Sequence, residues 1–450
     1  MTKSKILLIG VIILFILVAA WFMFECPPFE KCPGTRPLSG PPPPVVVLTM
    51  VGPWDSANDW KDVSEKFNAY KKKQENGYLD VLINYKKISD QANYEDIIRE
   101  MQFEGKGPNI FMLFNSWIPR YQEKLLPVPA KMMDVSQFKN TFAQVTVDDL
   151  MSDEGTIYAL PFYIDTPALY YNEDRFINEG FLNAPQTWDE FKNYTEKLTI
   201  LDENGNIEKA GAAFGGGSNV NRSQDIILLL AMQNNYRNGI LESEISIRNP
   251  ETISAIKFYT DFTDPAKRFY TWNEDQIYSI DAFTQRKATM MINYSHHIDN
   301  VTTKTGGILK FKIAPVPQFD KNYKVNYATY WVPAVPKIAP CKSSVSCYDL
   351  AWEYLNFAAK KENVGLYLDA TNRASANLQL AQEQASDSDD ARSVFASQVL
   401  TAKSWPRYDD KAVDKVLLEM LDSIITNDEN KKKTIEQAAN YAASKIRSLD

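Results

Sequence analysis

Residues 157–198 read IYALPFYIDTPALYYNEDRFINEGFLNAPQTWDEFKNYTEKL. Two apolar runs, Ile157 to Phe162 and Ala168 to Tyr171, are typical of buried strands. Asn172 follows as a helix cap, and the Pro-Gln-Thr-Trp sequence that ends at Trp188 begins a longer helix. The stretch therefore predicts strand, strand, helix, turn and helix, which is a mixed α/β arrangement.

The N-terminal third of the chain alternates strand and helix signals. Strands are expected at 45–50, 79–86 and 110–114, and helices at 58–73 and 94–104. This order predicts a mainly parallel sheet covered by helices. Because ligands bind at the carboxyl ends of such strands, the loops at 52–56 and 115–117 are candidate ligand loops.

Five further segments match one family in the same order: Gly107-Pro-Asn109, FTQRKATMMIN from Phe283 to Asn293, Ala314-Pro-Val-Pro317, AWEYLNF from Ala351 to Phe357, and Thr371-Asn372. Together with residues 157–198 they resemble the extracellular solute-binding proteins of family 1, the sugar-capturing subunits of ABC importers. The sequence departs from the family pattern where Arg286 and Tyr294 stand at glycine positions.

The resemblance implies a type II periplasmic binding fold, in which two α/β lobes close on a ligand like a clamshell. The implied first lobe covers 45–159 and 328–370, and the second covers 160–327 and 371–450. The chain would first cross between the lobes near Ile157 to Ile164. Closure would then be a hinge motion around the ligand.

The N-terminus predicts a membrane anchor over residues 1–25. Lys3 and Lys5 precede an uncharged run from Ile6 to Phe24, which as a helix would span about 28 Å. Basic residues before the run place the remaining chain outside the cytoplasm. Two alternatives stay open: a cleaved signal peptide, and lipidation of Cys26, which Phe24 and Glu25 disfavour.

Residues 26–44 are proline-rich and predict a semi-rigid spacer between the anchor and the globular part. The four cysteines form two equally spaced pairs, Cys26 with Cys32 and Cys341 with Cys347. Each pair could close a small disulfide loop in an oxidising compartment. A metal site is the alternative, but the chain has only two histidines to complete a ligand set.

Charge and motifs narrow the classes of function. A net charge of −8 argues against a nucleic-acid partner. The G-x-S-x-G and H-E-x-x-H motifs are absent from the sequence. A glycosidase needs two carboxylates at a set separation, and Asp55 and Asp165 are candidates whose distance the sequence does not give. We therefore expect a binding protein without cofactors rather than an enzyme.

A sugar site needs aromatic platforms together with polar groups that orient the hydroxyls. The expected cleft loops supply both. The candidate ligand-binding residues are Trp54, Asp55, Asn115, Ser116, Trp117, Tyr163, Asp165, Gly216, Ser218, His296, Tyr330, Trp331, Trp405 and Arg407. For each of them, ordinary packing or helix capping is the alternative.

We therefore expect an anchored monomer on the extracytoplasmic side of a bacterial membrane. It would capture an oligosaccharide or sugar derivative between its lobes and deliver it to an ABC permease. A domain that presents ligand to a membrane signalling partner is the alternative, as is a binder of a non-sugar solute such as an anion or ferric ion.

Overall fold

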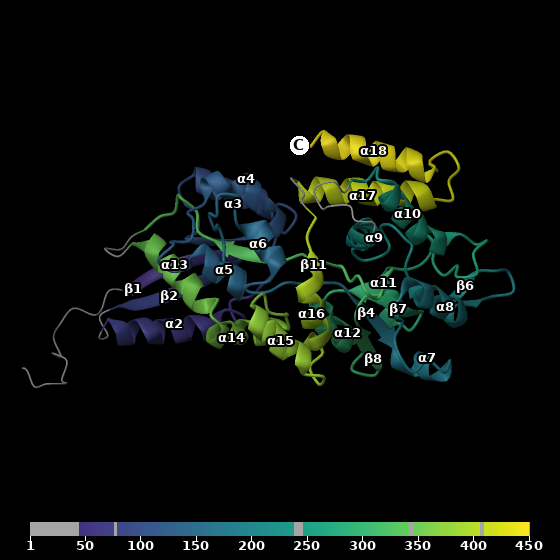
Figure 1. The fold of residues 1–450 in the computed structure, drawn as a ribbon, viewed down its shortest axis with the longest axis horizontal. Helices are drawn as coiled ribbons and strands as arrows, with labels where there is room; N and C mark the ends of the chain where they lie inside the picture. Colours follow the sequence, from purple (N-terminus) through teal and green to yellow (C-terminus); the bar gives the residue numbers. More distant parts are fainter. Residues whose placement is uncertain (1–44, 76–78, 238–245, 342–345, 406–408, 450) are drawn as a thin grey trace, which may run out of the picture.

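The computed structural model describes residues 45–75, 79–237, 246–341, 346–405 and 409–449. They form two α/β lobes that lie side by side along the long axis of the molecule (Figure 1). Within these residues no helix is both long and apolar enough to cross a membrane. The expected anchor and spacer, including Cys26 and Cys32, lie outside the described residues.

The first lobe contains a four-stranded sheet of order β10-β3-β1-β2. Its strands are β1 (Val45–Gly52), β2 (Asp80–Lys87), β3 (Ile110–Phe114) and β10 (Trp331–Ala334). β1 is parallel to β2 and β3, and β10 runs antiparallel to β3 with Trp331 opposite Phe114. The carboxyl ends of β1 and β3 therefore lie at the same edge as the start of β10.

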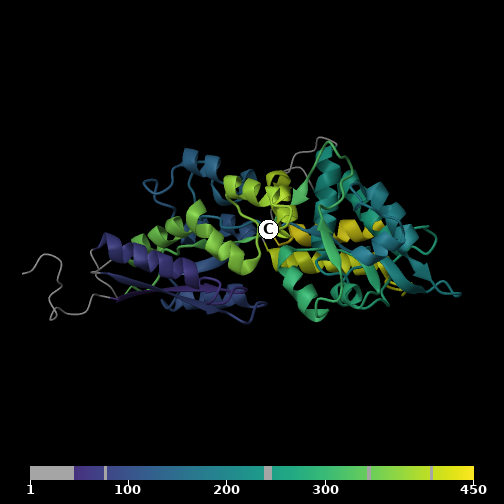
Figure 2. The same ribbon diagram turned by 90° about the horizontal axis from the view of Figure 1, so that it is seen from below.

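Helices cover both faces of this sheet (Figure 2). Phe67 of α2 and Ile98 of α3 are fully buried, so the apolar stripes of these helices form the core with β1 and β3. The helical segments of this lobe are α2 (Lys61–Gln74), α3 (Tyr94–Phe103), η1 (Asn115–Trp117), α4 (Ile118–Tyr121), η2 (Gln122–Lys124), α5 (Val135–Thr141), α6 (Gln144–Leu150), α13 (Cys347–Ala358) and α14 (Lys361–Thr371).

The second lobe contains a five-stranded sheet of order β5-β6-β7-β4-β8. Its strands are β4 (Ala168–Asn172), β5 (Ile200–Leu201), β6 (Ile207–Ala213), β7 (Ala288–Asn293) and β8 (Phe311–Ala314). β6 and β7 are parallel, and β4 is antiparallel to β7 with Ala168 opposite Asn293. The segment before β4 and the segments after β6 and β7 therefore leave the sheet at one edge.

The remaining helices pack on the second sheet or join the lobes, and α17 and α18 lie along its outer side (Figure 1). They are α7 (Glu173–Asn178), α8 (Trp188–Leu198), α9 (Ser223–Arg237), α10 (Pro250–Thr260), η4 (Asp261–Thr263), α11 (Ser279–Thr284), η5 (Ser295–His297), α12 (Ile298–Lys304), α15 (Leu378–Ser386), α16 (Arg392–Gln398), η6 (Val399–Thr401), α17 (Asp410–Ile425) and α18 (Ile435–Arg447). Two short strands, β9 (Asn326–Tyr327) and β11 (Ala402–Lys403), pair in parallel.

Two connections pass side by side from one sheet to the other. Asp165 and Thr329 exchange backbone hydrogen bonds of 3.1 and 3.0 Å, and Tyr163 pairs with Ser375 of a third extended segment. The prediction of a strand over 157–162 is wrong, because this segment makes only isolated bridges. Pro161 lacks the N–H that a ladder needs, so the apolar run crosses between the lobes as extended chain.

Left-handed backbone conformations occur at Arg286, which stands at a glycine position of the family pattern, and at Asn372 of the Thr371-Asn372 segment. Arg286 has a φ of 60° between α11 and β7, and Asn372 has a φ of 53° as the C-cap of α14. Asparagine tolerates this region better than arginine does. Left-handed turns are therefore formed at these two positions although neither carries glycine, whereas Tyr294, at the other glycine position, has an extended backbone with a φ of −93°.

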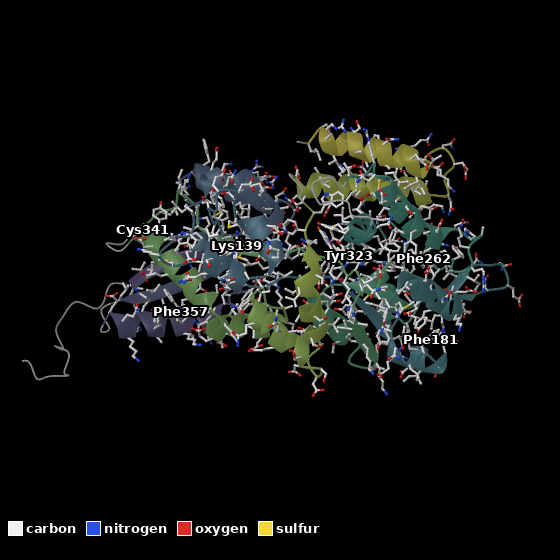
Figure 3. The ribbon with its side chains drawn as sticks, in the orientation of Figure 1. Lys139, Phe181, Phe262, Tyr323, Cys341 and Phe357 are labelled. Carbon is white, nitrogen blue, oxygen red and sulfur yellow. A yellow bond between two sulfur atoms is a disulfide. The ribbon has the colours of Figure 1, made fainter. Side chains whose placement is uncertain are left out.

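The predicted disulfide between Cys341 and Cys347 is confirmed. It joins the chain after β10 to the start of α13 in the first lobe, where Cys341 and Phe357 lie in Figure 3. Phe181 and Phe262 lie in the second lobe in the same view. The disulfide therefore cross-links two segments of the first lobe and does not connect the two lobes.

Candidate functional site

Loops from one edge of each sheet contribute residues to the region where the chain crosses between the lobes. Trp54 and Asp55 follow β1, and Asn115 follows β3. Asp165 precedes β4, and His296 follows β7 in the second lobe. This is the arrangement expected of a ligand site in an open α/β sheet.

Asp55 is the centre of a buried polar network. Its side chain is 5% exposed and accepts hydrogen bonds from Arg373 Nη1 (2.9 Å), the Tyr367 hydroxyl (2.9 Å) and Trp60 Nε1 (3.1 Å). With both carboxylate oxygens engaged, Asp55 is built to hold the loop after β1 in place. Sequence reasoning missed Arg373, which stands next to the Thr371-Asn372 box.

Arg373 also packs on Tyr163. Its guanidinium carbon lies 4.1 Å from the centroid of the tyrosine ring. The Tyr163 hydroxyl accepts a hydrogen bond of 3.1 Å from the backbone N–H of Trp331, and burial raises the pKa of Tyr163 to about 12. Tyr163 therefore links the two connections between the lobes and stays protonated at neutral pH.

Trp54 is the aromatic residue of this loop that is open to solvent. Its side chain is 48% exposed, whereas the neighbouring Asp55 and Trp60 are buried. Its carbonyl oxygen accepts a hydrogen bond of 2.9 Å from Lys87 Nζ. A rigid backbone with a free indole face is the geometry that a stacking platform requires.

A second polar network surrounds Asp149, which sequence reasoning also missed. Asp149 Oδ2 accepts hydrogen bonds from Asn115 Nδ2 (2.9 Å) and the Tyr330 hydroxyl (2.6 Å), and Oδ1 accepts one from the Ser404 hydroxyl. Burial raises the pKa of the Asp149 carboxyl. Asn115 and Tyr330 are 3% and 1% exposed, so both are buried supports of the site rather than exposed surface.

Trp117 and Trp331 belong to an aromatic cluster with Tyr94 and Phe114. The rings of Trp117 and Trp331 meet edge-on at 5.2 Å, and Trp117 Nε1 donates a hydrogen bond to Asp410 of α17. Trp117 is 1% exposed and Trp331 is half-buried. Ser116, between Asn115 and Trp117, has a buried hydroxyl without a partner.

Asp165 faces the loop after β7. Its Oδ1 accepts a hydrogen bond of 3.2 Å from the Ser295 hydroxyl, and its Oδ2 lies 3.1 Å from His296 Nδ1. Asp165 is buried, whereas half of the His296 side chain is exposed. The structure therefore brings these two predicted site residues together, with the imidazole presented outward.

The glycine-rich loop after β6 packs against its own lobe. A Cβ on Gly216 would come within 2.7 Å of the buried Trp272 ring, and the backbone N–H of Ser218 donates to Asp422 of α17 at 3.0 Å. Ser218 and Asp422 line a hollow of about 370 Å³ between the loop and α17. Gly216 and Ser218 are thus placed beside α17 rather than among the residues around Asp55.

Of the last two predicted residues, Trp405 is described, and it lies near the start of α17 in the sequence. Trp405 is half-buried and follows Ser404, which binds Asp149. Arg407 lies outside the described residues. A second hollow of about 380 Å³ is on the first lobe, lined by Met133, Phe142, Lys360 and Asn377 among others, and contains none of the predicted site residues.

A family model described as bacterial extracellular solute-binding protein matches residues 64–394. A maltotriose-binding protein of Pyrococcus abyssi is 28% identical over 50% of this chain and 45% of its own length. A maltodextrin-binding protein of Bacillus subtilis is 24% identical over 68% of each chain. The chain thus matches about half the length of the first of these relatives.

Solved structures share the two-lobe fold. The crystal structure of a cyclic α-maltosyl-1,6-maltose binding protein from Arthrobacter globiformis superposes with a TM-score of 0.68. The alignment has 15% sequence identity and covers 90% of this chain and 99% of that one. At this identity the likeness shows the fold alone, so the type II periplasmic binding architecture predicted from the sequence is confirmed for the described residues.

Proposed function

The chain belongs to the bacterial extracellular solute-binding proteins, and on that premise we propose that it captures a carbohydrate between its two lobes and delivers it to an ABC importer. The relatives named for maltotriose and maltodextrin support an oligosaccharide as the ligand. These relatives are binding proteins, which supports capture without chemical conversion.

One observation supports this proposal most directly. The exposed indole of Trp54 lies next to a buried ionic network in the region where the lobes are connected. Trp54 is 48% exposed, and the next residue, Asp55, is held by Arg373. A platform fixed in this way contacts a sugar ring without the entropic cost of ordering a loop.

The polar half of the proposed site is on the second lobe. The outward imidazole of His296, held by Asp165, can donate to or accept from a sugar hydroxyl. Asn115, Tyr163, Tyr330, Trp331 and Trp405 complete the proposed surface, mostly as supports for the exposed groups. Gly216 and Ser218 are its weakest members, because they pack against Trp272 and α17.

Ligand capture would close the lobes around the paired connections. Two backbone hydrogen bonds join Asp165 to Thr329, and we propose that the two lobes rotate about this pair of connections. We propose lobe boundaries of 45–159 with 328–370, and 160–327 with 371–450. We propose a monomer as the working unit, since a single chain carries both lobes.

Delivery requires the domain to stay near its permease. Membership of an extracellular family puts the globular part on the extracytoplasmic side. We propose that the apolar run from Ile6 to Phe24 anchors it and that the proline-rich residues 26–44 act as the spacer.

Thermal unfolding of the full-length chain in a mild detergent tests the proposal. Maltotriose, maltotetraose and cyclic maltooligosaccharides should raise the melting temperature, because a ligand at a hundred times its Kd stabilises the native state by about 2.7 kcal/mol. Glycerol 3-phosphate, a short peptide and ferric citrate are the comparison ligands. A shift with one of these, and none with any sugar, would overturn the carbohydrate assignment.

A further inference from the structure

Three polar side chains meet at the edge of the second sheet where β6 and β7 end. Asn221 lies in the turn after β6, Asn293 is the last residue of β7, and His297 ends the short helix η5. None of the three was among the residues expected from the sequence. Asn221 Nδ2 lies 2.9 Å from Asn293 Oδ1 and 3.4 Å from His297 Nε2, so this one amide contacts both neighbours.

The orientation of the Asn293 amide is determined by its donors. Its Oδ1 accepts hydrogen bonds from the backbone N–H of Tyr294 (2.9 Å) and from Asn221 Nδ2 (2.9 Å). A backbone N–H can only donate, so the oxygen must be on that side. The Nδ2 group of Asn293 is buried and has no acceptor, and the residue is 2% exposed.

The tautomer of His297 follows from the same contacts. The Tyr278 hydroxyl donates to Asn221 Oδ1 at 2.6 Å, which leaves Asn221 Nδ2 facing the histidine. Burial lowers the pKa of His297 to about 4, so its ring is neutral at pH 7 and carries one N–H. Since Nε2 accepts from Asn221, that hydrogen is on Nδ1, which is buried and without a partner.

Asn293 Nδ2 and His297 Nδ1 are therefore two buried donors without an acceptor, on two side chains that both contact the Asn221 amide. Leaving a buried donor unpaired costs about 1–3 kcal/mol, so such groups are expected to have a partner in the working state. Asp165, the carboxylate that contacts the loop after β7, is already engaged by Ser295 and His296. The missing partner must bring its own oxygen.

We propose that Asn293 and His297 form a subsite in which each donates a hydrogen bond to an acceptor oxygen of the ligand, with Asn221 positioning both side chains. This inference rests on the proposed carbohydrate binding and deepens it. The oxygen could belong to a hydroxyl or ring of a neutral sugar or to the carboxylate of an acidic sugar. Both sources offer the lone pairs that two N–H groups require.

The first test reads the histidine directly and needs no ligand. The chain has only two histidines, so selective ¹⁵N labelling gives the signals of His296 and His297 alone. The His296→Gln variant assigns them. The expected result is a neutral His297 with its hydrogen on Nδ1, and a hydrogen on Nε2 would overturn the subsite.

The second test measures binding by calorimetry with maltotriose and with a uronate-ended trisaccharide. Asn293→Leu and His297→Phe keep the volume and remove the donors, and each should weaken the better-bound probe about 5- to 20-fold. Asn300→Leu, an exposed asparagine on α12, is the matched control and should bind like the wild type. Melting temperatures without ligand confirm that each variant is folded.

The outcomes separate the two proposals. If the wild-type protein binds neither these probes nor any other sugar, carbohydrate binding fails and the subsite fails with it. If the wild type binds a sugar but both donor variants bind it equally well, carbohydrate binding stands and the subsite is overturned. A His297 Nδ1 resonance that moves on sugar binding, together with the loss of affinity, supports both, and the preferred probe identifies the oxygen.

Discussion

The guanidinium of Arg373 stacks on the ring of Tyr163 at 4.1 Å while its Nη1 atom holds Asp55 at 2.9 Å. Tyr163 in turn accepts the backbone N–H of Trp331. One side chain therefore joins the loop that presents Trp54 to both connections between the lobes.

Replacing Arg373 by methionine should destabilise the protein. The substitution keeps the stem that packs on Tyr163 but leaves the buried Asp55 carboxylate with only the neutral donors Trp60 and Tyr367. Removal of one partner of a buried ion pair lowers the free energy of unfolding by about 3–5 kcal/mol. Urea unfolding at pH 7 measures this loss.

The double variant Asp55→Asn with Arg373→Met supplies the control, because it removes both charges. It should recover part of the stability lost in Arg373→Met alone. Two outcomes would show that the ion pair does not supply this stability. One is a loss below about 1 kcal/mol in Arg373→Met. The other is a double variant whose loss of unfolding free energy exceeds the sum of the losses in the two single variants.

Trp54→Ala should weaken sugar binding about tenfold, or about 1.4 kcal/mol, with little change in melting temperature. Trp54 is 48% exposed, so removal of its ring opens no cavity. Trp117→Ala is the matched contrast, since Trp117 is 1% exposed and its loss should cost about 3–5 kcal/mol of stability. Calorimetry and thermal unfolding separate the two effects. If Trp54→Ala binds sugar with the affinity of the wild type, Trp54 is not a stacking platform.

Local sequence patterns were sufficient to predict the first three strands and the first two α-helices of the described residues. The alternation over residues 45–114 predicted β1, β2, β3, α2 and α3, because the apolar pattern of each element is contained in its own segment. Of the two glycine positions taken by other residues, Arg286 forms a left-handed turn and Tyr294 does not. The run 157–162 was misread because extended chain between two lobes has the same apolar composition as a strand.

The partners of the site residues could not be predicted, because they come from distant parts of the chain. Asp55 is bound by Arg373, and Asn115 by Asp149, whose contacts depend on how the lobe packs. Exposure separates Trp54 from Trp117, although both follow strands with the same pattern. The unpaired donors of Asn293 and His297 leave no signal in the sequence at all.

The Cys341–Cys347 disulfide should add about 2 kcal/mol to the stability of the first lobe. Its sequence separation is 6, and for so short a loop the chain-entropy estimate is near the lower end of the usual range. The double variant Cys341→Ser with Cys347→Ser should unfold at lower urea concentration. Sugar affinity should not change, because the disulfide lies away from the proposed site, and a loss of affinity would contradict the placement of that site.

Stability should also depend on pH through His297, because burial and the neighbouring His296 lower its pKa to about 4. Lys304 acts in the same direction, and Asp165 opposes it. In the unfolded chain the pKa is about 6.5. Between pH 6.5 and 4 the unfolded state therefore binds more protons than the native state, and the free energy of unfolding falls as the pH decreases through this window.

The contribution of His297 should be complete above pH 6.5 and should not change further below pH 4. His297→Gln removes the titrating ring, so its unfolding free energy should fall less steeply between pH 6.5 and 4.5 than that of the wild type. His296→Gln should retain most of the steep dependence, since the exposed His296 is not the buried group. Urea unfolding at pH 7.0, 6.0, 5.0 and 4.5 gives the three curves. Parallel curves for the wild type and His297→Gln would show that His297 titrates normally in the native protein, and would remove the neutral ring on which the Nδ1 donor depends.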